Sequence, residues 1–218
     1  MILRYYGHSL FTMAFQSGLT LLTDPYGEFC NYPRQTLKAD IVTVSHHHHD
    51  HDAVSMVAGS PTVLDQPGVH SPSRDILVTG VPAKHDAVNG TKFGDNIIFV
   101  VEADGLKIVH LGDLGQILTE RQRQAIGTPD VLLTPVGGHY TTDAALAVEN
   151  IRILRPRITV PMHYQTQHNM EMHIQTEQPF LTLMKTSPKP MPLCRITAGD
   201  LPQRPAVILM AVTAPTES

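Results

Sequence analysis

Short apolar runs separated by turn-forming residues fill the first half of the chain and predict β-strands. Ser17-Gly18 separates two of these runs and indicates a β-hairpin. A β-branched run ends abruptly at His46, which is typical of a strand buried on both faces. Residues 53–58 favour a short helix instead. The strands predicted in this half cover residues 2–7, 10–16, 19–25, 39–45, 61–68 and 76–86.

Helices and strands share the second half. Asp104-Gly105 between two apolar runs predicts a tight hairpin, and residues 87–95 indicate a loop. The clearest helix covers residues 141–156, because apolar residues recur at helical spacing and Thr142 or Asp143 can cap its start. Further helices are predicted at 118–126 and 179–186, and further strands at 96–103, 106–112, 129–138, 158–164, 192–198 and 206–212.

The composition is that of an ordinary globular protein, with 42% hydrophobic and 17% charged residues in a chain of 218. This length usually makes one domain, and no linker or change of composition divides residues 1–218. Because strands dominate and helices stand between some of them, we expect a two-sheet core flanked by helices.

Charge and cysteine content narrow the classes of partner. The formal net charge is −4 and no lysine or arginine stripe is present, so no nucleic-acid partner is expected. No apolar run approaches the ~18 residues of a membrane span, and the N-terminus lacks a signal-peptide pattern. Cys30 and Cys194 lie far apart and form no CxxC pair. We therefore predict a cytoplasmic protein acting on a small molecule, with homo-oligomerisation left open.

Thirteen histidines point to a role for this residue beyond packing. Four predicted strands are followed by a side chain that can bind metal: His46, His85, Asp113 and His163. The ends of buried strands gather along a sheet edge, where clefts form, so we expect these four side chains to converge. Taken singly, Asp113 also fits a turn and His163 also fits a core position.

Residues 46–52, HHHHDHD, form the densest group of candidate ligands. Side chains alternate in an extended segment, so His46 and His48 point together while the histidines at 47 and 49 face away. Asp50 and His51 follow the bend and can serve a second ion. Imidazole and carboxylate suit zinc, and also manganese or iron. Four ligands within six residues fit two ions about 3.5–4 Å apart better than one. The tract is internal, unlike a purification tag, and the remaining alternative is a solvated loop that binds metal adventitiously.

The pattern His46-x-His48-x-Asp50-His51 resembles the HxHxDH motif of the metallo-β-lactamase superfamily. The segments YYGHSLFTMAF, LTLLTDP, VPAKHD, HLGDLG and PVGGHYTTDAALAVENIRILRPRITVPMHY extend this resemblance over nearly the whole chain. They are similar to the branch that includes ascorbate-6-phosphate lactonase and the N-acyl-phosphatidylethanolamine-hydrolysing phospholipase D. The resemblance implies an α/β (α+β) fold, a four-layer αββα sandwich with the site at one edge between the sheets. It also implies two divalent ions, zinc first with manganese or iron as alternatives, held by His46, His48 and His85 at the first position, by Asp50, His51 and His163 at the second, and bridged by Asp113.

The function implied by the resemblance is that of a metal-dependent hydrolase. A hydroxide held by the two ions would cleave a small ester, lactone, amide or phosphodiester. Asp50 and Asp113 are predicted catalytic residues, with Asp50 orienting the hydroxide. His139 stands where the branch more usually has an aromatic residue, and it is predicted to protonate a leaving group or bind substrate, with a loop histidine as the alternative. Lys84 and Arg34 either meet an anionic substrate or are solvated.

Other interpretations stay open at this point. A nuclease of the same fold is disfavoured by the missing basic surface. A di-iron redox protein is disfavoured because those relatives typically carry glutamate in place of His48. A non-enzymatic metal-binding module does not explain the complete ligand set. His8 and Asp24 either orient ligands or only make hydrogen bonds at strand ends. His110 should face away from Asp113 and serve a structural or orienting role.

Overall fold

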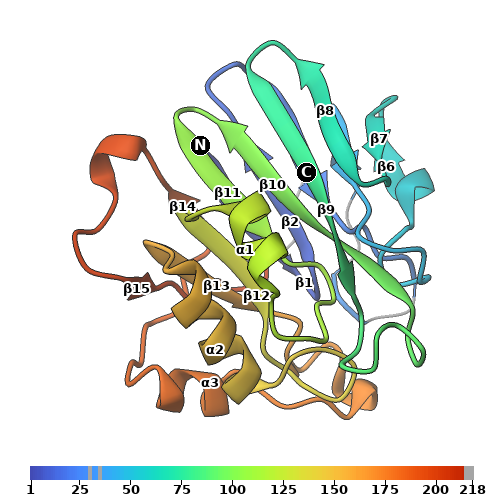
Figure 1. Cartoon of the computed structure of the whole chain (residues 1–218). Coiled ribbons are helices and arrows are strands. Elements are labelled where there is room, and N and C mark those ends of the chain that lie inside the picture. Colours follow the sequence, from blue (N-terminus) through green and yellow to red (C-terminus); the bar gives the residue numbers. More distant parts are fainter. Residues whose placement is uncertain (29–30, 34–35, 214–218) are drawn as a thin grey trace.

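Two mixed β-sheets packed face to face form the core of the computed structural model, which describes residues 1–28, 31–33 and 36–213 (Figure 1). In strand order, the first sheet consists of β14 (Cys194–Arg195), β1 (Ile2–Gly7), β2 (Leu10–Ala14), β3 (Thr20–Thr23), β5 (Ile41–Thr43) and β7 (Thr62–Leu64). The second consists of β15 (Ala206–Val207), β13 (Ile158–Met162), β12 (Val131–Pro135), β11 (Leu106–His110), β10 (Asp95–Ala103), β9 (Ile76–Lys84) and β8 (Gly68–Ser73). A separate parallel pair joins β4 (Leu37–Lys38) to β6 (Val57–Ala58).

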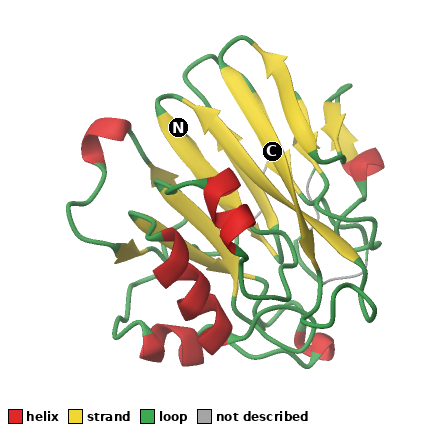
Figure 2. Ribbon diagram, in the orientation of Figure 1, coloured by secondary structure: helices red, strands yellow, loops and turns green. Residues whose placement is uncertain are grey.

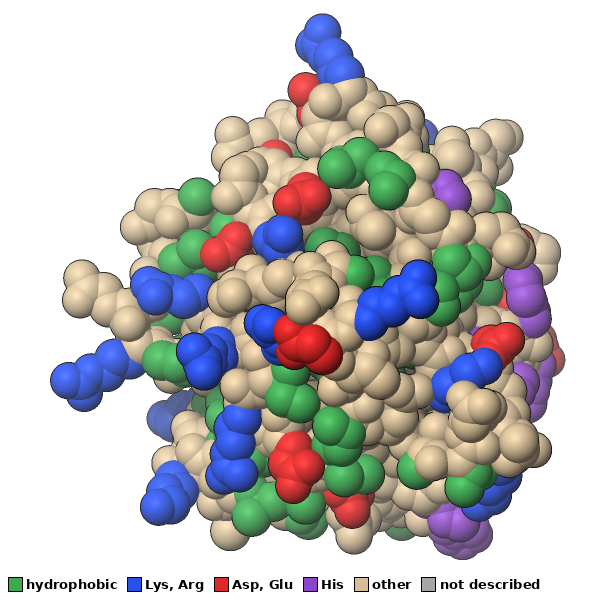
Figure 3. Space-filling view, in the orientation of Figure 1, with side chains coloured by type: hydrophobic (Ala, Val, Ile, Leu, Met, Phe, Trp, Pro, Cys, Tyr) green, Lys and Arg blue, Asp and Glu red, His purple; other side chains and the backbone are tan. Residues whose placement is uncertain are grey.

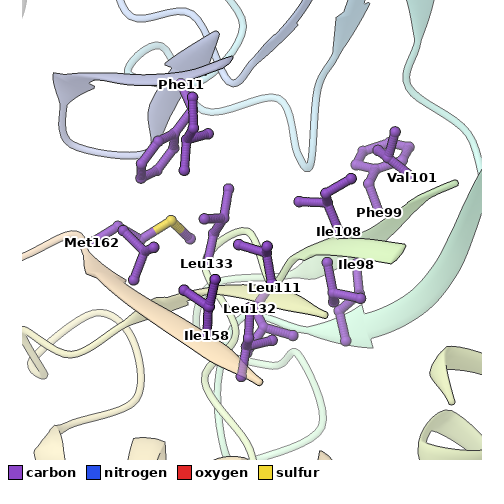
Figure 4. Packing of buried hydrophobic residues seen from close by; sticks show 14 of the residues in the cluster. Phe11, Ile98, Phe99, Val101, Ile108, Leu111, Leu132, Leu133, Ile158 and Met162 are labelled. Carbon is purple, nitrogen blue, oxygen red and sulfur yellow. The ribbon is translucent and has the colours of Figure 1, made fainter. Parts of the chain in front are cut away.

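Apolar side chains from both sheets meet in the space between them. Phe11 on β2 points from the first sheet toward Leu133 and Met162 of the second (Figure 4). Every residue of β12 and β13 is buried, because both faces of these strands are covered. Burying one large apolar side chain in such a core stabilises the fold by about 1.5–3 kcal/mol. This interior fixes the strand ends that carry the candidate ligands.

Helices α1 (Glu120–Ile126) and α2 (Ala144–Leu154) lie on the outer face of the second sheet, and α3 (Gln178–Leu183) packs against α2 (Figure 2). Thr119 and Gln122 form a capping box at the start of α1. Of the two predicted caps of α2, Asp143 is the one used, and its side chain accepts a hydrogen bond from the Leu146 N–H. The three predicted helices of the second half are therefore confirmed.

Loops and short elements cover the outer face of the first sheet. Val42 and Leu22 point to this side, where Leu37 and Val57 pack against them. The short helix predicted over residues 53–58 is confirmed only in part, as the single 3-10 turn η1 (Val54–Met56), which leads directly into β6. The architecture is the expected αββα sandwich, with its second helical layer reduced to these short elements.

Several strand predictions differ from the structure in length. The hairpin turns at Ser17-Gly18 and Asp104-Gly105 are confirmed, and the latter two residues have φ values of 54° and 71°. The late strands predicted at 192–198 and 206–212 shrink to two residues each, because beyond those residues the later segment forms only isolated bridges, from Met210 to Met191 and from Val212 to Tyr5. β8 was not predicted, since its sequence GVHSPS lacks alternation and carries a proline tolerated only at an edge.

Two further sequence expectations concern membranes and cysteines. Among the residues the structure describes, no helix combines the length and the apolar character needed to cross a membrane. Cys194 is a buried free thiol. Cys30 lies outside the described residues.

The candidate ligands meet at one end of the sandwich. β9, β11 and β13 run parallel to one another, so their carboxyl ends lie along the same edge of the second sheet. His85 and His163 directly follow β9 and β13, and Asp113 follows β11 after two residues. His46 arrives from β5 of the facing sheet. The convergence therefore draws on two sheets and not, as the strand pattern alone suggested, on one sheet edge.

Candidate metal centre

One carboxylate oxygen lies at the middle of the cluster. Asp113 Oδ2 is 3.2 Å from His51 Nε2, 3.3 Å from His85 Nε2 and 3.2 Å from His163 Nε2. All four residues are buried. Three imidazoles from distant segments thus face one oxygen, an arrangement that apolar packing alone does not favour.

The remaining predicted ligands flank this centre. His46, His48 and His85 offer ligand atoms within 4.8 Å of one another, and so do His46, His51 and Asp113. Asp50 Oδ2 lies 3.8 Å from His51 Nε2. The structure thus brings together all seven residues predicted to bind metal: His46, His48, Asp50, His51, His85, Asp113 and His163.

Burial and facing charges set the protonation of the cluster. Burial alone would raise the pKa of Asp113, but the facing imidazoles of His163 and His51 outweigh it and hold that pKa well below its usual range. Burial lowers the pKa of His46 to about 3, with the neighbouring His51 adding to the effect. For His51, the carboxylates of Asp113 and Asp24 outweigh burial and raise its pKa well above 6.5. The metal-free cluster therefore holds a proton on His51 between two carboxylates.

Asp24 fixes the orientation of two candidate ligands. Its Oδ2 accepts hydrogen bonds from His51 Nδ1–H at 3.0 Å and from the Ser45 hydroxyl at 2.6 Å. Because that hydroxyl donates to Asp24, Ser45 Oγ accepts from His46 Nδ1–H at 2.9 Å. Both imidazoles are thus held with Nδ1 protonated and Nε2 turned to the cluster. Of the two interpretations of Asp24, orienting ligands is the one this geometry supports.

One observation that does not depend on the sequence motif also indicates that these side chains fit a metal ion. His46 Nε2 is buried and, within the described part of the chain, has no hydrogen-bond partner. An unpartnered buried nitrogen is unfavourable unless something else satisfies it. Its lone pair lies in a cluster of imidazole and carboxylate donors, and such a set suits zinc and similar divalent ions.

Backbone strain is concentrated at the strand ends of the site. His8, Asp24 and His163 all adopt left-handed conformations, with φ values of 54°, 40° and 50°. Such a conformation costs roughly 1–2 kcal/mol for a residue with a Cβ, and it persists where surrounding structure enforces it. Gly137 permits one close approach, because a Cβ there would lie 2.2 Å from the His163 carbonyl oxygen. These conformations lower the stability of the fold but direct the side chains of the site.

His110 serves the site from outside the ligand set. It is fully buried, its Nδ1 accepts the Gly112 N–H at 3.2 Å, and its Nε2–H donates to the Ser9 carbonyl at 3.0 Å. Ser9 in turn places its hydroxyl 3.5 Å from Asp113 Oδ1. The predicted structural or orienting role of His110 agrees with these contacts.

A cavity of about 550 Å³ opens beside the cluster. Phe93 and Tyr140 form part of its wall, their ring centroids lying 5.8 Å apart. His139, the predicted leaving-group acid, is exposed and is not among the lining residues, although its ring packs against Tyr140 at 4.4 Å. The lining consists of Asn31, His48, His49, Asp50, His85, Phe93, Asp113, Tyr140, His163, His168, Asn169, Glu171 and Met172.

Sequence patterns did not single out Phe93, Tyr140, Asn169 or Glu171 as lining residues. Phe93, Tyr140 and Asn169 come from loops, and Glu171 comes from the 3-10 turn η2 (Met170–Met172). The Gly137-Gly138 pair before Tyr140 signals a special turn there. Lys84 pairs with Asp95 and lies outside this lining, while Arg34 falls outside the described residues. Figure 3 shows exposed histidines toward the right-hand edge of this face, apart from most lysine and arginine side chains.

Comparison with known proteins now decides the family. The sequence model of the family described as "Beta-lactamase superfamily domain" matches residues 2–163. The chain belongs to this superfamily. A UPF0173 metal-dependent hydrolase of Thermoplasma acidophilum is 31% identical over 187 residues, covering 74% of this chain and 82% of the relative.

Solved structures agree with this assignment. A Thermotoga maritima protein, provisionally named a Zn-dependent hydrolase of the metallo-β-lactamase superfamily, aligns with a TM-score of 0.80 and 32% identity, over 96% of this chain and 97% of that one. A metallo hydrolase of Ignicoccus hospitalis aligns with a TM-score of 0.62 over 90% of this chain and 99% of that one, and at 22% identity it shows the fold alone. The chain is a metal-dependent hydrolase of the metallo-β-lactamase superfamily, and the resemblance to the lactonase and phospholipase branch stays a prediction.

Within this family site, the alternation of the histidine tract predicts unequal effects of substitution. His47 is exposed and faces Asp52 and Asp65 at 3.6 and 3.7 Å, away from the cluster. His47→Ala should therefore retain metal, whereas His48→Ala should lose it from the first position. Metal content after dialysis, measured by plasma mass spectrometry, checks this. Equal losses in the two variants would show that the assigned register is wrong.

The proton on His51 predicts a pH dependence of metal binding. Its pKa is raised well above 6.5, so at neutral pH the metal-free protein keeps a proton that an ion at Nε2 must displace. Affinity should therefore rise with pH, by about tenfold per unit, until pH exceeds the raised pKa. The same proton stabilises the metal-free fold below the unfolded pKa of about 6.5, and that contribution is lost as pH rises through the folded pKa. Competition with a chromophoric chelator of known pH dependence measures the affinity; a flat profile contradicts the assignment.

Proposed function

We propose that the chain hydrolyses a small organic substrate with two divalent metal ions, zinc first, held between the ends of its two sheets. The observation that carries this proposal is Asp113 Oδ2, which faces three imidazole nitrogens at 3.2–3.3 Å. A carboxylate in such a position suits a bridge between two cations. Metal ions bound there would supply a water activated at neutral pH and would polarise the bond to be cleaved.

The side chains divide between two metal positions. We assign His46, His48 and His85 to the first, Asp50, His51 and His163 to the second, and Asp113 to both. Asp50 is half-buried and lines the cavity, so its carboxylate is positioned to hold and orient the attacking water. Asp113 is buried and ionised, so it keeps its negative charge facing the cluster throughout.

The cavity lining favours a neutral carbonyl substrate. The Phe93 ring lies 5.3 Å from the ring of His85, a proposed metal ligand. The aromatic wall of the cavity therefore begins next to the proposed metal site and continues to Tyr140. Among the described lining residues there is no lysine or arginine to receive a remote phosphate, and Glu171 adds a carboxylate. We therefore place an ester, lactone or amide with an apolar group ahead of a phosphodiester.

Contact with the leaving group is assigned to Tyr140 and not to His139. Tyr140 is half-buried and lines the cavity, whereas His139 is exposed outside the lining. A phenol can donate a hydrogen bond to a departing oxygen or nitrogen. His139 instead packs edge-on against the Tyr140 ring, which helps to hold that ring in place.

We also propose that residues 1–218 form a single domain. The family match ends at residue 163, but the chain beyond it enters both sheets. β14 pairs with β1 in the first sheet and β15 with β13 in the second. These two pairings support one folding unit.

A panel of neutral esters, lactones and amides, with one phosphodiester for comparison, tests the function. The chain is stripped of metal and reloaded with zinc, manganese or iron. We expect turnover of one neutral carbonyl class that chelation abolishes and zinc restores. Equal turnover by the stripped protein contradicts the proposal. Two irons per chain together with absent hydrolysis would favour the redox alternative.

A further inference from the structure

We propose that His8 is an additional ligand of the second metal position. This inference rests on the proposed two-ion site and adds a residue to it. The His8 Nε2 lies 3.0 Å from His51 Nε2 and 3.2 Å from Asp50 Oδ2. His8, His51 and His163 also offer ligand atoms that all lie within 4.8 Å of one another.

These separations match those of atoms that share one ion. Two ligand atoms at about 2.1 Å from a zinc ion, at tetrahedral to right angles, lie about 3.0–3.4 Å apart. The His8–His51 and His8–Asp50 distances fall in that range, as does the 3.2 Å between His51 Nε2 and Asp113 Oδ2. By distance, His8 Nε2 is as much a part of the second position as the predicted ligands.

The contact between two Nε2 atoms also requires a cation or a proton between them. His51 Nδ1–H donates to Asp24, so the Nε2 of neutral His51 carries a lone pair only. Two lone pairs cannot face each other at 3.0 Å in a buried site, so one of these nitrogens carries a proton in the metal-free protein. A metal ion at the second position would take the place of that proton and bind both imidazoles at once.

The backbone holds His8 rigidly at this place. Its side chain is fully buried, and the His8 carbonyl accepts hydrogen bonds from the Tyr5 hydroxyl at 3.0 Å and from the His163 N–H at 2.9 Å. Its ring centroid is 4.2 Å from that of His163. The left-handed conformation at His8 directs the side chain back over the cluster. A residue joined directly to a predicted ligand moves with it.

Hydrogen bonding to Asp50 is the competing role, and two substitutions separate it from ligation. His8→Gln keeps a donor for Asp50 but offers a poor zinc ligand, and His8→Ala removes both. The matched control is His70→Ala, which removes a histidine of β8 that bonds the Gln66 carbonyl outside the cavity lining. The readouts are the affinity for the second zinc equivalent and the visible absorption of the cobalt-substituted protein, which reports coordination number.

Losing a residue that only orients a ligand typically lowers metal affinity by about 10- to 100-fold. Both His8 variants should lower the affinity for the second ion by more than this. The first equivalent should be unchanged, and the cobalt bands should intensify as coordination falls. Wild-type affinity and spectrum in His8→Gln would overturn the proposal in favour of a hydrogen bond to Asp50. The binding of two ions by the wild-type protein is measured independently of turnover. An absence of turnover on the substrate panel would therefore contradict the proposed hydrolysis, while the zinc affinities would still decide whether His8 is a ligand.

Discussion

Asp113→Asn should remove metal from both positions and lower hydrolysis by at least about 1,000-fold, the equivalent of about 4 kcal/mol of lost transition-state stabilisation. The substitution preserves shape but replaces an ionised carboxylate by a neutral amide. Asp113 Oδ2 faces His51, His85 and His163 at 3.2–3.3 Å, so this one carboxylate reaches residues assigned to both predicted positions. An amide nitrogen at that place would also present donors toward the predicted metals.

Metal content and kcat/KM on the best substrate of the panel measure this effect. The matched control is Asp143→Asn, the same chemical change at the N-cap of α2, where asparagine caps as well as aspartate. That control should keep both ions and full activity. Thermal unfolding of the metal-free variants tells a misfolded protein from an emptied site. Retention of two ions by Asp113→Asn would refute the bridging assignment.

The meeting of the candidate ligands was predictable because strand geometry places them. His85 and His163 directly follow buried strands, and His46 and Asp113 follow within three residues, so their positions depend on regular elements. Alternation then separates His47 from His46 and His48, whereas His49, which was expected to face away, lines the cavity. Both cues are local in sequence, and the strand ends that they mark do meet in the structure.

His8 and the cavity wall were not predictable by the same argument. His8 comes between β1 and β2 in a left-handed conformation that strand alternation does not describe. Phe93 depends on Asp86, whose carboxylate accepts four backbone N–H groups of the loop at 2.7–2.9 Å. Side chains placed by loop hydrogen bonds leave no periodic signal in the sequence.

The over-long strands have the same cause. The apolar residues at 192–198 and 206–212 indicate that these segments are buried. A buried irregular segment is as rich in apolar residues as a strand is. Cys194, Ile196, Leu209 and Met210 are all buried, yet only Cys194 lies within a paired strand. Pairing depends on which edge of a sheet is free, and that is decided by the whole fold.

Asp24→Asn should weaken both metal positions together, by about 10- to 100-fold each, although Asp24 belongs to neither predicted ligand set. Its Oδ2 holds His51 directly and His46 through the Ser45 hydroxyl, so one carboxylate serves a ligand at each position. The hydrogen bond from His51 outweighs burial and keeps the pKa of Asp24 below its usual range, so the group is an ionised acceptor. The asparagine side chain has one amide oxygen in place of the two carboxylate oxygens of Asp24. It therefore leaves one buried donor without an acceptor, which should cost about 1–3 kcal/mol of folding stability as well.

Ser45→Ala separates the two halves of this relay. It cuts the path to His46 but leaves the Asp24–His51 contact, so only the first ion should bind more weakly. Asp40→Asn is the matched control, because Asp40 is exposed and its carboxylate accepts a hydrogen bond from the Thr20 N–H, outside the site. Stepwise zinc titration with chelator competition resolves the two equivalents. If Ser45→Ala weakened both ions as much as Asp24→Asn, the loss would come from general disorder of the strand end. If it weakened only the first, the two positions would be linked through a residue that touches no metal, and the spacing of Asp24 and Ser45 at adjacent strand ends would be as much a part of the site as its histidines.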